Sequence, residues 1–406
     1  MPALLPTLAL FALLAATPDP HAGGVAPAET AETAETVGTV GTVGTVGTVG
    51  TVGTVGTVGT VGTVGIVVHD PARRDGEAPR SWRVALYYPA QAGTGIVRPY
   101  AGDPALLAHM AEAGYYDVDR AAMEAWARQP APAREHARAL PGRLPLVTLS
   151  PGSGVAAFHY SELASAIARR GYAVAVVEHP GLGLSLGTDG RIASAADDPL
   201  LQREDPAEWQ PRIRDWIRDL SATLDALPGH PAVRAAGIAL DPTRVVAVGH
   251  SLGGTVALEA CSEEPRLSAC ADFDGVVEGT RTYAEGPRRP TLLLLGRSLK
   301  PERPLVAPDL GKPPFDFLAR GGRDDGWAVA IGGGSHMSFS DAPREMPDTL
   351  SRFGGTLMDA GRSEQVYAGI VDAFARAFLP GGGGNAALEA FFRDIPEARA
   401  VHAAGR

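Results

Sequence analysis

Cysteine is nearly absent from this sequence: only Cys261 and Cys270 occur in 406 residues. They do not form a Cys-x-x-Cys pair, which argues against a structural zinc site. We therefore expect neither a metal nor another cofactor. The two cysteines either close a short disulfide loop in an exported protein or lie buried as free thiols. Their spacing does not decide between these alternatives, because a disulfide depends on the separation of the two Cα atoms.

Positive charge is also scarce. The 36 Lys and Arg residues are outnumbered by 46 Asp and Glu residues, so the formal net charge is −10, and the basic residues are scattered along the chain. Such a charge balance repels polyanions, and the sequence therefore predicts no binding to nucleic acid. With 45% hydrophobic and 20% charged residues, the composition is otherwise that of a globular protein that buries a core.

Long apolar runs are missing as well, so no transmembrane helix is predicted. The one apolar run near the N-terminus, residues 3–16 (ALLPTLALFALLAA), is too short to span a bilayer. It suits the apolar region of a signal peptide, although no Lys or Arg precedes it. We expect residues 1–24 to be a signal peptide and the protein to be secreted, with the cytoplasm as the alternative.

Residues 36–65 are an unbroken Thr-Val-Gly repeat. Its period of three matches neither a helix nor a strand, and Gly at every third position disfavours a packed element. We interpret residues 25–65 as a low-complexity, disordered linker, which is either a tether or a repeat expansion without a role. The folded domain is expected at 66–380. It is followed by a C-terminal tail at 381–406 with one short helix at 386–392.

Within 66–380, short apolar segments alternate with amphipathic ones. The predicted strands are 82–88, 146–149, 174–177, 245–248, 271–273, 292–295 and 328–331, and the amphipathic segments include 160–170, 212–227 and 252–259. Continuous apolar strands separated by helices indicate a mostly parallel sheet covered on both faces, which is the doubly wound α/β class. Two insertions interrupt the pattern: 104–140 is helical in character, and 297–323 is Pro-rich and irregular.

The sequence GHSLGG at residues 249–254 contains a Gly-x-Ser-x-Gly motif. The segment before it reads as a strand and the segment after it as a helix, which is the strand–turn–helix context that a nucleophilic serine requires. Residues without side chains let the backbone pass closely on both sides of the strained turn. Ser251 is therefore the predicted nucleophile, the alternative being a glycine-rich turn with an incidental serine.

The general base is found by elimination. If the order along the chain is serine, acid and histidine, only His336 and His402 follow Ser251. His402 lies in a polar tail, whereas His336 follows a predicted strand on a glycine-rich loop, so His336 is the predicted base. For the acid, Asp274 lies at the end of the strand at 271–273, and Asp272 would point away from it. Other carboxylates between serine and histidine stay open as alternatives.

Two backbone N–H groups are expected to bind the developing oxyanion. The N–H of Leu252 directly follows the nucleophile. The N–H of Ser153 lies in the loop after the strand at 146–149, where Pro151 has no N–H to offer.

With these residues in hand, the chain resembles the platelet-activating factor acetylhydrolase family and its bacterial relatives over residues 69–378. The similarity rests on the segments VHDPAR at 68–73, PLVTLSPGSG at 145–154, VEHP at 177–180, GHSLGG, FDG at 273–275 and GSHMSFSD at 334–341. The resemblance implies an α/β-hydrolase fold, a Ser251–Asp274–His336 triad and metal-independent ester hydrolysis on short or oxidised phospholipid acyl chains. Where many members have His-Gly, this chain has Pro151-Gly152.

The sequence therefore predicts a serine carboxylic-ester hydrolase that works through an acyl-enzyme on a small-molecule ester or lipid, with transient contact to lipid surfaces. The same fold and triad would also serve a polyester depolymerase, an acyltransferase or a peptidase. A catalytically silent binding protein is the alternative from another class.

Overall fold

The computed structural model describes residues 59–75, 78–101, 103–113, 120–277, 279–296, 312–345 and 358–402. The chain divides into a unit of residues 1–56 and a unit of residues 57–406, and every described residue belongs to the second unit. The predicted signal peptide and most of the Thr-Val-Gly repeat thus lie outside the described residues.

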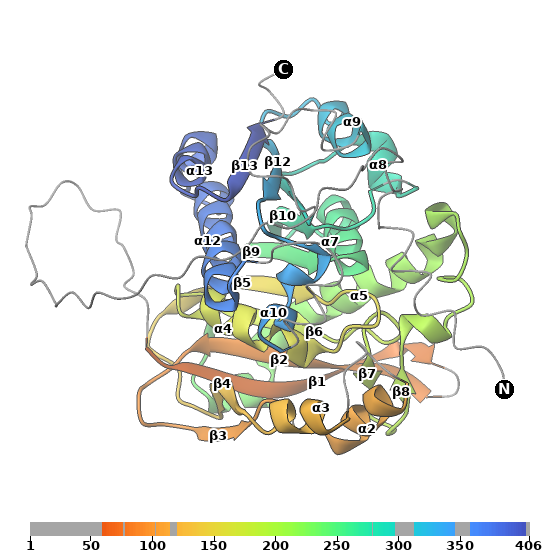
Figure 1. Cartoon of the computed structure of the whole chain (residues 1–406), viewed down its shortest axis with the longest axis vertical. Coiled ribbons are helices and arrows are strands. Elements are labelled where there is room, and N and C mark those ends of the chain that lie inside the picture. The colour runs from red at the N-terminus through yellow and green to blue at the C-terminus, as the bar shows by residue number, and fades with distance from the viewer. Residues whose placement is uncertain are drawn as a thin grey trace, which may run out of the picture. The chain divides into compact units, whose positions relative to one another are not determined.

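Eleven of the described strands form one sheet (Figure 1). In spatial order they are β13 (Ala398–His402), β12 (Gly326–Ile331), β11 (Thr291–Leu295), β10 (Leu267–Phe273), β9 (Ala239–His250), β5 (Arg143–Ser150), β6 (Ala173–Val177), β2 (Ala78–Pro89), β1 (Val61–Asp75), β4 (Pro130–Glu135) and β3 (Ile96–Pro99). The strands from β12 to β6 are parallel, and β13 and β2 flank them antiparallel. The carboxyl ends of the parallel strands meet at one edge of the sheet, so the loops that follow them converge there.

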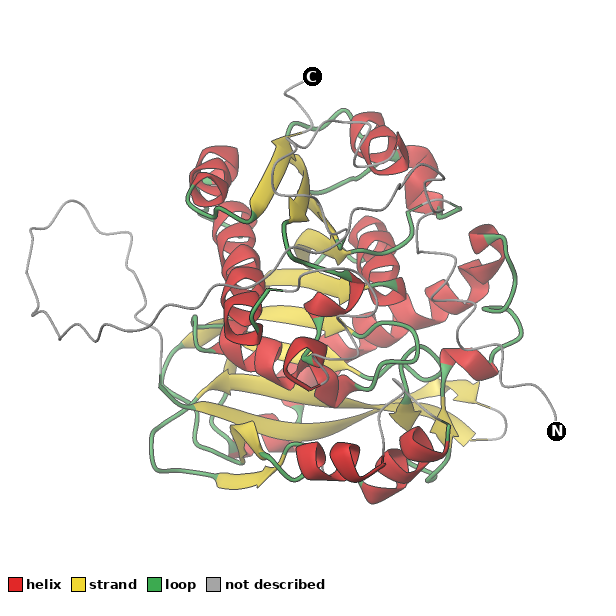
Figure 2. Ribbon diagram, viewed as in Figure 1, coloured by secondary structure: helices red, strands yellow, loops and turns green. Residues whose placement is uncertain are grey.

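Helices cover both faces of the sheet (Figure 2). In β9, Val246 and Val248 enter the core that contains α4 (Ser161–Ala168) and α12 (Ala360–Phe378). Val245 and Ala247 enter the core on the other face, with α5 (Gln210–Ala226) and α7 (Leu252–Glu263). This division follows from the two-residue period of a strand. Because both faces are covered, β6 is apolar and buried at every position.

Shorter elements connect this framework. They are α2 (Pro104–Glu112), α3 (Arg120–Ala127), α6 (Pro231–Ala235), α8 (Arg281–Glu285), α9 (Lys312–Arg320), α10 (Ala342–Glu345), α13 (Gly384–Arg393), the hairpin of β7 (Ser185–Leu186) and β8 (Ile192–Ala193), and the 3-10 turns η2 (Ala157–Tyr160), η3 (Ala195–Asp197), η4 (Pro206–Trp209), η5 (Leu227–Gly229) and η7 (His336–Phe339). All seven predicted strands are confirmed, as β2, β5, β6, β9, β10, β11 and β12, and the three amphipathic segments are α4, α5 and α7.

The predicted start of the domain at residue 66 is too late, because β1 already begins at Val61, within the repeat. Val61 and Val64 are buried, and Gly62 lies directly under the ring of Tyr88, where a Cβ would come within 2.5 Å of a ring carbon. The three-residue period of this segment does not predict a strand. Burial and pairing with β2 nevertheless make it one.

The predicted C-terminal tail is also part of the domain. The helix expected at 386–392 is present as α13, and its Leu388 and Phe392 are buried in the same core as α12. The unpredicted strand β13 then pairs antiparallel with β12, which would otherwise be an exposed sheet edge. The boundary at residue 380 is therefore wrong, because these contacts continue the core beyond it.

Both insertions contain secondary structure that their amino-acid composition does not predict. The insertion at 104–140 holds α2 and α3, as predicted, but it also contains β4, which pairs with β1 and β3. The insertion at 297–323, predicted to be irregular, contains α9. On the described part of the chain, no helix is long and apolar enough to cross a membrane.

The two cysteines form a disulfide bond, with their Cα atoms 6.1 Å apart. Cys261 lies in the last turn of α7 and Cys270 in β10. The bond therefore ties the helix that follows Ser251 to the strand that precedes Asp274.

Candidate active site

Ser251 occupies a strained turn between the end of β9 and the start of α7. Its φ of 54° and ψ of −128° belong to a region that residues other than glycine rarely adopt. Its backbone N–H donates to the carbonyl of Phe273 at 2.7 Å, which holds the turn against the end of β10. Such a turn lifts the serine side chain out of the sheet and is typical of a nucleophile elbow.

The three glycines of the GHSLGG motif are required by close contacts. A Cβ at Gly249 would lie 2.0 Å from the carbonyl oxygen of Gly253, and one at Gly253 would lie 2.3 Å from that of Pro151. A Cβ at Gly254 would lie 1.8 Å from Oδ1 of Asp272. None of these contacts can be relieved without moving backbone or a buried carboxylate, so the turn has room for hydrogen alone at each position.

His336 and Asp274 meet at the same edge of the sheet. His336 Nδ1 lies 2.7 Å from Asp274 Oδ2, although 62 positions separate the two residues in the sequence. His336 follows β12 at the start of η7, and Asp274 follows β10. The Gly296 N–H, at the end of β11, donates to Asp274 Oδ1 at 2.9 Å.

The environment of Asp274 favours its charged form. Burial alone would raise its pKa, but the hydrogen bond and the charge of His336, together with the Gly296 amide, lower the pKa below its usual value. A carboxylate held in this state fixes which ring nitrogen of His336 carries the proton, because Nδ1 must donate to it. The other nitrogen, Nε2, is then available as a base.

The two predicted oxyanion donors lie on either side of the turn. Leu252 begins α7, so its N–H belongs to the first turn of a helix, where amides have no partner within the helix. In the loop after β5, the N–H of Gly152 donates to the hydroxyl of Tyr160 and that of Gly154 to a backbone carbonyl. The N–H of Ser153, between them, has no partner among the described residues.

The other candidates for the acid and the base lie elsewhere. Asp272 is buried, its Oδ1 accepts the N–H of Gly275 at 2.8 Å, and burial raises its pKa well above the usual range. It supports the turn and does not contact the histidine, as the alternation of strand faces predicts. His402 belongs to β13, where it lies opposite Trp327 in the sheet. Within the described ranges, no three His, Cys, Asp or Glu side chains gather as a metal site.

One polar residue at the site escaped the sequence interpretation. His250 is 1% exposed and its ring centroid lies 4.7 Å from that of His336. Its place beside the nucleophile in the motif was the only signal in the sequence, because its partners come from distant segments.

Another imidazole–carboxylate pair joins η2 and α10. His159 Nδ1 is 2.5 Å from Glu345 Oε2, and the Tyr100 hydroxyl contacts both Glu345 and Asp341. The ring of Trp126 is stacked on His159, with centroids 5.3 Å apart. This group, His159, Glu345, Tyr100 and Asp341, is called the sealed cluster below.

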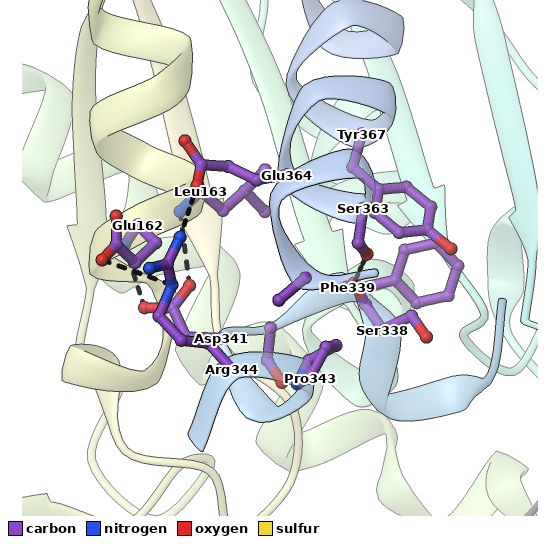
Figure 3. A pocket seen from close by; sticks show the side chains of 12 residues that line it. Glu162, Leu163, Ser338, Phe339, Asp341, Pro343, Arg344, Ser363, Glu364 and Tyr367 are labelled. Carbon is purple, nitrogen blue, oxygen red and sulfur yellow. Dashed lines mark hydrogen bonds and ion pairs between the residues drawn. The ribbon is translucent and has the colours of Figure 1, made fainter. Parts of the chain in front are cut away.

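A small pocket, lined in part by Asp341 of the sealed cluster, lies between α4, α10 and α12 (Figure 3). Arg344, which lines this pocket, lies between Glu162 and Glu364, with ion-pair distances of 3.5 and 3.2 Å. Neither Ser251 nor His336 lines this pocket, so it is separate from the candidate active site.

The chain is similar to parts of several known hydrolases. Residues 144–279 match the family model described as serine aminopeptidase, S33, which spans β5 to the loop after Asp274. The chain is 35% identical over 105 residues to the hydrolase ffsE of Aspergillus flavipes, covering 26% of this chain and 19% of that protein. It is 23% identical over 269 residues to a probable 1-alkyl-2-acetylglycerophosphocholine esterase of Arthroderma benhamiae, covering 64% and 57%. The chain thus spans less than two thirds of either curated relative.

Among solved structures, a ferulic acid esterase from Streptomyces cinnamoneus is 27% identical, with a TM-score of 0.66 over 84% of this chain and 96% of that one. The chain has the α/β-hydrolase fold. The predicted fold class is therefore confirmed, and the family model and the named esterases support the predicted enzyme class, a carboxylic ester hydrolase. In an α/β-hydrolase, the strained turn after β9 and the loops after β10 and β12 are where nucleophile, acid and base are expected.

Proposed function

We propose that the protein is a serine carboxylic-ester hydrolase that works through an acyl-enzyme, with Ser251 as nucleophile, His336 as general base and Asp274 as the acid that orients it. The observation that carries the proposal is the strained turn of Ser251 at the sheet edge where the 2.7 Å His336–Asp274 pair lies.

In the first half of the reaction, the Ser251 hydroxyl attacks the ester carbonyl carbon while His336 Nε2 takes its proton. The tetrahedral intermediate carries a negative oxygen, which the Leu252 and Ser153 N–H groups bind. As the intermediate collapses, the bond to the leaving alkoxide breaks and the imidazolium returns the proton to it. Asp274 stabilises the imidazolium throughout, which its lowered pKa favours.

In the second half, water replaces the alcohol. His336 removes a proton from water as its oxygen attacks the acyl carbon, and the second tetrahedral intermediate then collapses. The bond to the Ser251 oxygen breaks, the imidazolium returns the proton to that oxygen, and the carboxylic acid is released. The same two amides serve both oxyanions.

For the substrate, we propose short-chain esters, including the short acyl groups of phospholipids. The resemblance of the GSHMSFSD and FDG motifs to platelet-activating factor acetylhydrolases supports this class. So does the partial similarity to an esterase named for an acetyl ester of a choline phospholipid. The ferulic acid esterase structure favours aromatic acyl esters as a second candidate, because it aligns with most of this chain.

We also propose that the protein is secreted and that it contacts lipid surfaces transiently. The Cys261–Cys270 disulfide supports secretion, since such bonds persist mainly in oxidising compartments. Separation of cell and medium fractions of the native host, followed by detection of the protein, tests the location.

An ester panel tests the activity. Wild type and Ser251→Ala are compared on p-nitrophenyl acetate and butyrate, a long-chain ester, methyl ferulate, an acetylated ether phospholipid and an aminoacyl p-nitroanilide. Short-chain turnover that disappears in Ser251→Ala supports the proposal. Cleavage of the anilide alone would indicate a peptidase, and unchanged turnover in Ser251→Ala would remove the assigned nucleophile. A fluorophosphonate that fails to label wild-type Ser251 would favour a silent binding protein.

A further inference from the structure

A chain of three hydrogen bonds joins the loops that make up the candidate site. The Gly152 N–H donates to the Tyr160 hydroxyl oxygen at 2.8 Å, and that hydroxyl lies 2.8 Å from His250 Nδ1. His250 Nε2 lies 2.8 Å from the backbone oxygen of His336. These three hydrogen bonds thus connect the loop that contains Ser153 with His250, the neighbour of Ser251, and with His336, the proposed base.

The chemistry of the groups fixes the direction of every bond. The His336 backbone oxygen can only accept, so His250 Nε2 donates to it, and the Gly152 N–H can only donate, so the Tyr160 oxygen accepts from it. In the neutral imidazole Nδ1 is then unprotonated and accepts the Tyr160 O–H. A single neutral tautomer of His250 satisfies all three contacts.

Burial stabilises the same protonation state. Tyr160 is 0% and His250 is 1% exposed. Burial lowers the pKa of His250 to about 3, and the neighbouring His336 adds to this effect. Burial likewise raises the pKa of Tyr160, which keeps its hydroxyl a donor. His250 therefore stays neutral when His336 takes up a proton beside it.

The spacing at the nucleophile leaves little tolerance. A Cβ at Gly152 would lie 3.0 Å from His250 Nδ1 and 3.3 Å from the Cβ of Ser251. A small displacement of the Gly152 loop thus changes the distance between the Ser153 amide and the nucleophile, and errors of about 1 Å in such positions cost roughly a hundredfold in rate.

We propose that Tyr160 and His250 are positioning residues, which hold the oxyanion loop and the base-carrying loop in register with Ser251. The inference rests on the proposed function, because it assigns these residues to the same site. Neither residue reacts with substrate: Tyr160 acts through Gly152, and His250 through the backbone of His336.

Tyr160→Phe removes one oxygen atom and leaves the ring in place. We expect kcat on p-nitrophenyl butyrate to fall about 10- to 100-fold, with KM changed less than about twofold, because the loss concerns alignment in the transition state. The rate at which a fluorophosphonate labels Ser251 should fall by a similar factor.

Tyr172→Phe is the matched control. Tyr172 is buried in the same core as Tyr160, and its hydroxyl bonds Asp372 at 2.9 Å, away from the site. This variant should lose a comparable amount of stability to urea and keep the wild-type kcat. If Tyr160→Phe also keeps the wild-type kcat and labelling rate, the inference is wrong and the hydrogen-bond chain is structural only.

Three substitutions at His250 test its two hydrogen bonds separately. They also test the inference if the Tyr160→Phe variant does not fold. His250→Asn keeps an acceptor near Tyr160, His250→Gln keeps a donor near the His336 carbonyl, and His250→Ala removes both. We expect Asn and Gln each to retain more kcat than Ala, and equal kcat in all three folded variants would contradict the inference. Absence of labelling in wild type would instead count against the proposed function itself.

Discussion

Two imidazole–carboxylate pairs in the described part of the chain have nearly the same geometry and opposite accessibility. In the His336–Asp274 pair the Nδ1–oxygen distance is 2.7 Å and the side chains are 21% and 22% exposed. In the His159–Glu345 pair the distance is 2.5 Å and the side chains are 2% and 1% exposed. The first pair lies at the sheet edge beside the strained Ser251, whereas the second is covered by Trp126.

The contrast shows that a histidine–carboxylate contact does not by itself indicate catalysis. What distinguishes the first pair is access to solvent and a neighbouring nucleophile. The sealed cluster around the second pair joins separate segments, since Tyr100 precedes α2, His159 belongs to η2 and Glu345 to α10. We therefore expect changes in the first pair to affect rate and changes in the sealed cluster to affect stability.

One motif joins the two pairs. The segment at 334–341 contains His336 of the His336–Asp274 pair and Asp341 of the sealed cluster, which also holds the His159–Glu345 pair. Asp341 accepts the backbone N–H groups of Glu162 and Leu163, at 2.9 and 3.3 Å, and so caps the first turn of α4. The sealed cluster is thus an anchor for the loop that carries the proposed base.

The largest effect is expected for Asp274→Asn. The amide cannot hold His336 in the same tautomer or stabilise its charged form, so kcat should fall about 10³- to 10⁴-fold. Stability to urea should change little by comparison. Steady-state kinetics and urea unfolding on the same preparation check both parts, and a loss of less than tenfold in kcat would mean that another carboxylate is the acid.

The disulfide gives the next largest effect, on stability. Cys261→Ser with Cys270→Ser removes a cross-link that closes a short loop, which should lower the free energy of unfolding by about 2 to 3 kcal/mol. The double variant avoids an unpaired thiol. The hydrogen bond from the Ser251 N–H to the Phe273 carbonyl and the pairing of β9 with β10 still hold the turn, so kcat below the melting range should stay within about threefold of wild type. A large loss of kcat without loss of stability would show that the bond aligns the accessible pair.

Glu345→Gln tests the His159–Glu345 pair, because it replaces a carboxylate by an amide as Asp274→Asn does in the other pair. The amide no longer accepts from both His159 and Tyr100 as a carboxylate does, so the free energy of unfolding should fall by about 1 to 3 kcal/mol. The kcat of the folded variant should remain within about threefold of wild type. If kcat instead fell as far as in Asp274→Asn, the division between the two pairs would not hold.

The smallest effect concerns the pH dependence of stability. The Tyr100 hydroxyl has one proton and contacts the carboxyl groups of both Asp341 and Glu345, so one of these contacts requires a protonated carboxyl group. Burial, and then the charge of Glu345, raise the pKa of Asp341 well above the usual range. The folded protein therefore binds a proton that the unfolded chain releases above a pH of about 4.

The sign follows from this difference. The contribution of Asp341 to stability is fully present below the pKa of the unfolded chain and is lost as the pH rises toward the raised pKa of the folded state. Asp341→Asn replaces the acid by a neutral group, so the wild type should lose stability relative to this variant as the pH increases above 4. Urea unfolding of both proteins at several pH values measures the difference, and parallel curves would contradict the assignment.

The sequence predicted most of the sheet, because fully buried parallel strands are continuous apolar runs. β1, β3, β4 and β13 were missed. The order of β1 and β13 depends on pairing with β2 and β12 rather than on a pattern of their own. At the site, chain order and strand ends were enough to choose His336 and Asp274, and the structure places them in contact. Tyr160 was out of reach because its hydroxyl joins groups 8 and 90 positions away.

The entry of the repeat into β1 has a consequence for how this gene can change. Residues 61–65 are identical in sequence to any other VGTVG stretch of the tract. If whole Thr-Val-Gly units are gained or lost upstream, the same five residues therefore still form the start of the strand, with glycine again under the ring of Tyr88. The length of the tract can drift by replication slippage while the register between β1 and β2 is preserved. A change that is not a whole triplet would instead place valine or threonine against that ring.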